Sequence, residues 1–143
     1  MPDLHIDDFY RDTAKALILL YNAFPRKITL YVEDISGPDT PDDFGLHSKR
    51  HDAALNTLLW LGSTDYLSYQ TQIRSEALEE AVLTHRTFLL LNSDLNSGDF
   101  DHQAPHAGTD LLISKLREQL TSGTSSTLAI CVRTIMAASR QLL

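Results

Sequence analysis

The sequence predicts an α+β protein with a mixed helix-and-strand domain at residues 5–92, a linker at 93–108 and a C-terminal helical pair at 109–143. Apolar residues recur with the helical period near the start of the chain and again in its last third. Short β-branched or alternating segments lie between these helices. The stretch rich in Ser, Asn, Asp, Gly and Pro has the composition of a linker.

Composition places the chain among ordinary globular proteins. It has 143 residues, the size of one domain, with 43% hydrophobic and 22% charged residues. No apolar run is long enough to cross a bilayer, and the acidic start lacks a secretory signal pattern. A single cysteine, Cys131, excludes an internal disulfide and suits a reducing compartment. We therefore expect a cytoplasmic protein with no membrane partner.

The first helix is expected to run from Asp7 to about Ala23, where apolar side chains recur along one wide face. Pro25 ends it, because the residue before a proline is pushed out of the helical conformation. The β-branched and aromatic segment 28–32 predicts a short strand. One or two helical turns are expected at 33–37, before Gly and Pro indicate a loop.

A longer helix is expected at about 48–61, preceded and opened by basic side chains and ended by Gly62, the residue type preferred just past a helix. Its leucines predict a core face, which turns Asp52, Ala53, Asn56 and the only tryptophan, Trp60, outward or to the edge. We expect this tryptophan to pack beneath the hairpin that follows.

That hairpin is predicted from the alternating segment 66–73 and the apolar segment 81–83. The intervening residues 74–79 lack glycine and predict a longer tip with a helical turn. A further helix at 85–92 is expected to begin at Thr84, whose hydroxyl can cap the first exposed amides.

The last two helices are expected to begin at Thr109 or Asp110 and at Thr124. The final helix is apolar around most of its circumference, so it either packs on its own chain or pairs with another subunit. We predict a homodimer in which this helix pairs with its copy in a second subunit. The expected interface residues are Leu128, Val132, Ile135 and Met136.

Residues 7–92 resemble the winged helix-turn-helix domain superfamily. The resemblance rests on two stretches. In the first, an apolar helix end at 58–62 precedes a strand beginning at 65–67. In the second, a strand at 81–84 leads into the apolar helical segment 88–91. The resemblance implies that the 48–61 helix is a recognition helix and that the hairpin is its wing.

A winged helix of this kind implies a DNA-binding transcriptional regulator that acts as a dimer on duplex DNA. The first turns of a recognition helix meet base edges and phosphates, where Lys, Arg, Asn and Ser are suitable contacts. The residues expected at the DNA are Ser48, Lys49, Arg50 and Asn56, with Arg26, Lys27 and Arg74 as phosphate contacts.

Charge supports a second interpretation, in which the winged helix is a protein-interaction module, an adaptor or assembly subunit that does not bind DNA. The net charge is −7, from 12 basic and 19 acidic residues. The expected wing carries Glu76, Glu79 and Glu80 beside one arginine. Such a surface repels phosphate and suits a basic protein partner.

No pattern predicts catalysis, a metal or a cofactor. The chain lacks a nucleophile elbow, a phosphate loop, a dinucleotide glycine pattern and a metalloprotease helix. His47 and His51 have the spacing at which two imidazoles share a metal ion, and Asp43 or Asp52 is a candidate third ligand. Without a further His or Cys cluster, we expect no metal site and no enzyme.

Overall fold

The computed structural model describes residues 4–94 and 111–142, so most of the expected linker and both expected caps of the penultimate helix lie outside the described residues. In chain order the elements are α1 (Leu4–Ala23), β1 (Ile28–Tyr31), α2 (Glu33–Ser36), α3 (Lys49–Ser63), β2 (Leu67–Ser68), β3 (Thr71–Ile73), β4 (Ala77–Leu83), α4 (His85–Leu91), α5 (Leu112–Ser122), α6 (Ser125–Ala138) and the 3₁₀ helix η2 (Ser139–Leu142). This mixed helix-and-sheet content agrees with the predicted α+β class.

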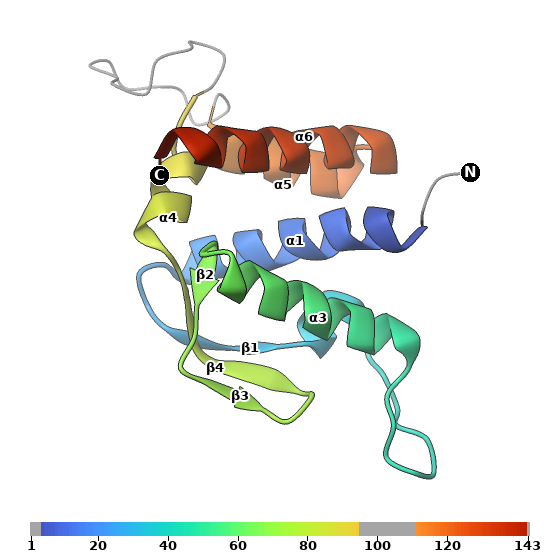
Figure 1. Ribbon diagram of the computed structural model, residues 1–143. Helices are drawn as coiled ribbons and strands as arrows, with labels where there is room; N and C mark the ends of the chain where they lie inside the picture. The colour runs from blue at the N-terminus through green and yellow to red at the C-terminus, as the bar shows by residue number, and fades with distance from the viewer. Residues whose placement is uncertain (1–3, 95–110, 143) are drawn as a thin grey trace.

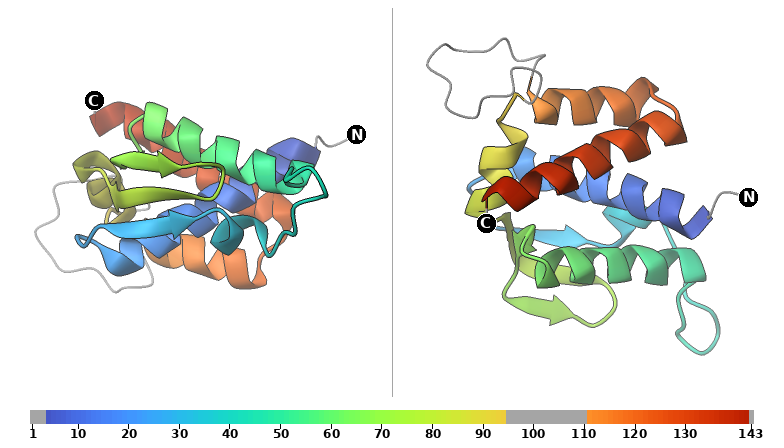
Figure 2. Two further views of the ribbon diagram at one scale, coloured as in Figure 1. Left: turned by 90° about the horizontal axis from the view of Figure 1, so that it is seen from below. Right: turned by 45° about the horizontal axis from the view of Figure 1, so that its top comes forward.

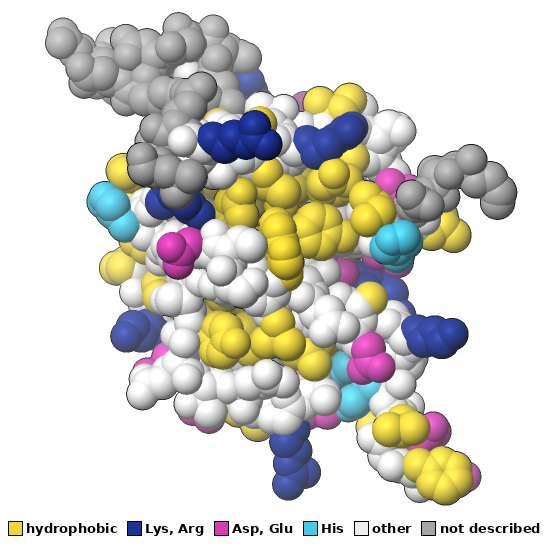
Figure 3. All heavy atoms as spheres, viewed as in Figure 1, with side chains coloured by type: hydrophobic (Ala, Val, Ile, Leu, Met, Phe, Trp, Pro, Cys, Tyr) yellow, Lys and Arg dark blue, Asp and Glu magenta, His cyan; other side chains and the backbone are white. Residues whose placement is uncertain are grey.

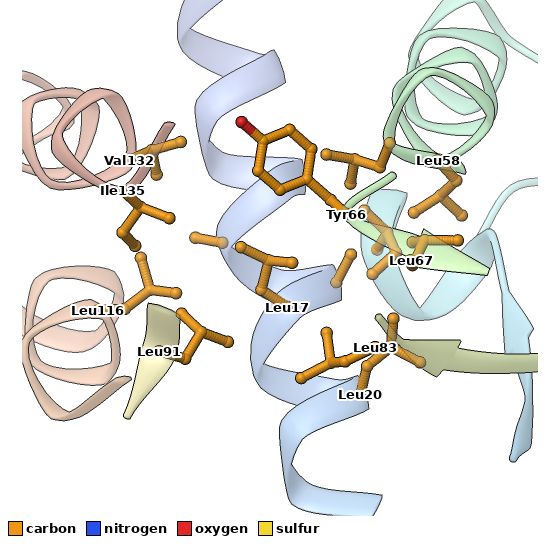
Figure 4. Close-up of a cluster of buried hydrophobic side chains, with 14 of the residues drawn as sticks. Leu17, Leu20, Leu58, Tyr66, Leu67, Leu83, Leu91, Leu116, Val132 and Ile135 are labelled. Atoms are coloured by element: carbon orange, nitrogen blue, oxygen red, sulfur yellow. The ribbon is translucent and has the colours of Figure 1, made fainter. Parts of the chain in front are cut away.

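α1 is the central element of the molecule. The sheet and α3 lie on one side of it, and α5 and α6 lie on the other (Figures 1 and 2). Figure 4 shows Leu17 of α1 between Leu58 on one side and Leu116 and Val132 on the other. All four side chains belong to one continuous buried cluster. The two predicted parts of the chain therefore share a single core.

The sheet is antiparallel, with β4 between β1 on one edge and β2 and β3 on the other. The prediction of one unbroken strand at 66–73 is wrong, because residues 69 and 70 separate β2 from β3. The returning strand is longer than predicted, since the hairpin closes at 74–76. Arg74 adopts a positive φ of 47° there, and the Glu76 amide donates to the Ile73 carbonyl.

Gly62 does not end α3 as predicted; it lies inside the last turn. A Cβ at this position would lie 2.8 Å from a ring carbon of Tyr69. Contact distances between real side chains are longer, so the missing side chain allows the tyrosine ring to approach the helix. The glycine therefore serves packing at this position, although its residue type suggested a helix end.

Three helices begin at side-chain caps, in which a hydroxyl accepts a hydrogen bond from an exposed backbone amide. Thr84 accepts from the Thr87 amide, which confirms the predicted start of α4. Ser48 caps α3 in the same way, and Thr124 caps α6 in a reciprocal pair with Thr127. These caps agree with three of the helix starts predicted from the sequence.

The final helix packs on its own chain. Leu128, Val132 and Ile135 are buried in the shared core, and Met136 is partly buried against it. Leu128, Val132 and Ile135 therefore differ from the predicted dimer contacts, because α1 and α5 already cover that face of α6. The homodimer itself stays a prediction. No helix among the described residues is long and apolar enough to span a membrane.

Candidate functional site

Three of the residues predicted to contact DNA, Ser48, Lys49 and Arg50, lie at the start of α3, and Arg50 is bonded within the chain. Arg50 forms a two-pronged ion pair with Asp12, whose carboxylate lies fully buried in the middle of α1. One of these bonds, from Nη1 to Oδ2, is 2.8 Å long. The Asp12 carboxylate raises the pKa of Arg50 further above its usual value. The predicted DNA contact at Arg50 is replaced by an internal one.

The other predicted contacts are dispersed. Lys49 and Asn56 are exposed on α3, and Ser48 is used as the helix cap. Arg74 is at the tip of the β3–β4 hairpin. This tip lies beside the start of α3, where the Ser75 carbonyl accepts a hydrogen bond from His51. The loop carrying Arg26 and Lys27 lies at the opposite end of α1 (Figure 1).

Acidic groups accompany the cations at the start of α3. Asp39 and Glu76 both bond His47, and Asp52 is exposed in the first turn of the helix. On the face shown in Figure 3, Lys and Arg side chains are scattered and no large basic patch forms around α3. Favourable binding to duplex DNA needs cations that face the phosphates together.

A groove of about 450 Å³ runs between α1 and α3. On α3, the lining residues recur at the helical spacing of one stripe, and on α1 they lie on one face of the first three turns. The lining residues are His5, Ile6, Phe9, Asp12, Ala53, Asn56, Thr57 and Trp60.

Trp60 is the largest side chain in this groove and is 43% exposed. Its ring meets Phe9 edge to face with centroids 5.3 Å apart, and it lies 6.2 Å from the Tyr66 ring. The prediction that Trp60 packs beneath the hairpin is wrong, because the α3 stripe that carries it faces α1. One side of the indole is held by aromatic contacts while the rest remains open.

A second hollow lies on the other side of α1, against α6, and shares Ile6 with the groove. Its lining includes Tyr10 and Ile130, the latter 56% exposed. Figure 3 shows hydrophobic side chains gathered over α1 between α6 and α3. We call Ile6, Phe9, Trp60 and Ile130 the apolar belt.

A separate polar cluster lies where the loop before α3 meets the hairpin. His47 Nδ1 is 2.8 Å from Asp39 Oδ2, and its Nε2 bonds Glu76. Hydrogen bonds from Ser48 and then His47 lower the pKa of Asp39 to about 2. The carboxylates of Asp39 and Glu76 raise the pKa of His47. This ion pair attaches the loop to the hairpin.

The sequence-based choice of residues missed partners that only the fold brings next to α3. Asp39 joins His47 and His51, whereas the candidate ligands Asp43 and Asp52 are not in that group. Asp12 was similarly hidden, because 38 residues separate it from Arg50. The apolar first turns of α1 were the one available signal for the groove.

The chain was compared with models of known protein families, with curated proteins and with solved structures, and no match was found in any of the three.

Proposed function

We propose that this protein is a protein-interaction module whose docking surface is the groove between α1 and α3. Its occupant is an apolar segment of another protein, flanked by basic residues. The observation that carries the proposal is the half-exposed Trp60 in an apolar groove at the molecular surface. Aromatic side chains in such positions are frequent anchors of protein interfaces.

The topology supports a winged helix used in this way. The order α1, β1, α2, α3, then the strands of a hairpin, and the central place of β4 between β1 and that hairpin agree with the resemblance seen in residues 7–92. In a winged helix of this kind, α3 would take the place of the recognition helix. In this proposal, its outward stripe binds protein together with α1.

The acidic charge of the chain favours a basic partner in the groove. The chain carries a net charge of −7, and the exposed Asp52 in the first turn of α3 directly precedes the groove residue Ala53 in the sequence. A second copy of the chain would bring the same acidic charge to the contact, and DNA would bring phosphates. A basic partner is instead attracted, which raises its association rate and suppresses the wrong partners.

Site-specific photocrosslinking tests this proposal. A photoreactive amino acid replaces Asn56, which lines the groove and is also one of the residues predicted to contact DNA. Gln72, exposed on β3, is the control position. We expect crosslinks from position 56 to one basic protein in cells of the source organism, and none to it from position 72.

The crosslinked protein is then purified and its affinity measured by titration. Loss of a central aromatic anchor costs about 2 kcal/mol or more, which weakens binding about 30-fold. We expect that loss for Trp60→Ala and for Ala53→Arg, which adds a repelling charge to the groove without removing buried atoms. Leu89→Ala, on α4, is a matched control because Leu89 is 45% exposed. Equal affinity of all these variants would refute the docking site.

A further inference from the structure

We propose that Asp39, His47 and His51 bind a divalent transition-metal ion such as Zn²⁺. This site is separate from the groove, and the proposal stands whether or not the groove binds protein. One ligand atom from each of the three residues lies within 4.8 Å of the other two. They come from the loop before α3 and from the first turn of that helix.

His51 provides the most specific observation. The side chain is fully buried, and its Nε2 lies 2.7 Å from the Ser75 carbonyl oxygen. A carbonyl only accepts, so Nε2 carries a proton, and the tautomer that this hydrogen bond selects has its lone pair on Nδ1. Nδ1 is buried and has no hydrogen-bond partner among the described residues.

An unpartnered buried acceptor costs about 1–3 kcal/mol, so its presence calls for an explanation. A metal ion supplies one. Metal-binding histidines commonly donate their second ring N–H to a backbone carbonyl, which sets the tautomer and holds the ring in place. His51 already makes that second contact to Ser75.

His47 and Asp39 complete the set of ligands. The His47 ring stacks on the His51 ring at 3.7 Å between centroids, and both His47 and Asp39 have largely buried side chains. Metal–ligand bonds are about 2 Å long, so binding draws these atoms together and turns the His47 ring out of the stack. Glu76, now bonded to His47, is placed to keep the hydrogen bond to its second nitrogen.

The ligand chemistry selects the metal. Two imidazole nitrogens and one carboxylate oxygen suit Zn²⁺, Co²⁺, Ni²⁺ or Cu²⁺, whereas Mg²⁺ and Ca²⁺ prefer oxygen ligands alone. Three protein ligands leave a tetrahedral position for water. A bound ion would join the loop to α3 and to the hairpin beside it, with Phe44 exposed at the loop tip.

The test is a titration of the metal-stripped full chain with Co²⁺, read by visible absorption, followed by displacement with Zn²⁺. We expect saturation at one ion per chain, a ligand-field spectrum and a higher Tm with Zn²⁺. Asp39→Asn and His47→Ala should each weaken affinity more than tenfold. Glu76→Gln, a positioning residue, should weaken it about tenfold. His85→Ala, exposed on α4, should leave it unchanged.

The wild-type titration does not depend on whether a variant folds, and each variant is checked by circular dichroism. Absence of a saturating spectrum from the wild-type chain would overturn the proposal. So would binding that survives in His47→Ala but is lost in His102→Ala plus His106→Ala, a pair of residues outside the described part of the chain.

Discussion

The start of α3 and the groove along its middle belong to the same helix but differ in how their side chains are satisfied. At the start, Arg50 and His47 are bonded to carboxylates of the same chain. In the groove, Trp60 contacts Phe9 yet leaves much of its surface open. Basic residues at the start of a helix therefore do not indicate a DNA contact until their partners within the chain are known. An exposed aromatic side chain in a groove still has surface that a partner can cover.

The largest effect is expected where an apolar side chain serves the fold. Ile135→Ala removes a fully buried side chain of α6 and should lower the free energy of unfolding by about 3 kcal/mol. Ile130→Ala, in the exposed belt on the same helix, should change it by less than about 0.5 kcal/mol. Urea unfolding measures both. A larger loss of stability for Ile130→Ala than for Ile135→Ala would contradict the assignment of Ile135 to the buried face of α6 and Ile130 to its exposed face.

The next effect separates the two basic residues at the start of α3. Arg50→Ala leaves the buried Asp12 carboxylate without its partner. We expect the free energy of unfolding to fall by about 2 kcal/mol, less than for a fully buried pair because the Arg50 side chain is 33% exposed. Lys49→Ala should cost less than about 0.5 kcal/mol. Thermal and urea unfolding compare Arg50→Ala with Lys49→Ala. Equally small losses of stability in the two variants would show that Arg50 does not stabilise the fold.

This pair also governs how DNA binding is tested. A double variant of Lys49 and Arg50 combines a surface change with damage to an internal ion pair. A loss of binding in that double variant would therefore reflect stability as well as contact. Lys49→Ala alone is the clean probe, because its side chain is exposed.

A smaller effect is expected at Ser48, a predicted DNA contact that caps α3 instead. Ser48→Ala removes the hydroxyl that accepts from the His51 amide, and such losses cost about 1 kcal/mol. Ser68→Ala, exposed on β2, should stay within about 0.5 kcal/mol. Urea midpoints compare the two variants, and indistinguishable values would show that the cap contributes nothing.

The smallest expected effect concerns Cys131, next to the exposed Ile130 of the belt. Burial raises the pKa of this thiol, and Lys115 opposes that shift in part. A raised pKa lowers the thiolate fraction at neutral pH, so iodoacetamide should react more slowly with the native chain than with the chain in urea. The native rate should rise as the pH increases. Equal rates at pH 7.5 would show that the thiol is not shielded.

Much of the fold follows from local patterns in the sequence. The 3.6-residue period of the apolar side chains predicted the long helices, and β-branched residues at 28–32 predicted β1. The break between β2 and β3 was not predictable in this way. It depends on how residues 69 and 70 meet β4, and on a tight hairpin in which Arg74 takes the left-handed conformation that usually signals glycine.

Less of the candidate site was predictable. The spacing on α3 placed Asn56 and Trp60 outward, which the structure agrees with, since both are exposed. Partners such as Asp12 and Asp39 are brought in by tertiary packing, and no spacing within α3 points to them. The groove arises only when the stripe on α3 meets the first turns of α1. Phe9 belongs to the apolar face predicted for that helix, whereas Ile6 lies before its expected start at Asp7.

We propose that the open face of α3 binds protein and not DNA, and fluorescence polarisation tests this directly. Labelled random duplex DNA is titrated with the wild-type chain across a salt series. We expect no saturable binding even at low salt, because the cations on the face shown in Figure 3 are dispersed and Arg50 is bonded inside the fold. Saturable binding that weakens steeply with salt and is lost in Lys49→Ala would contradict it.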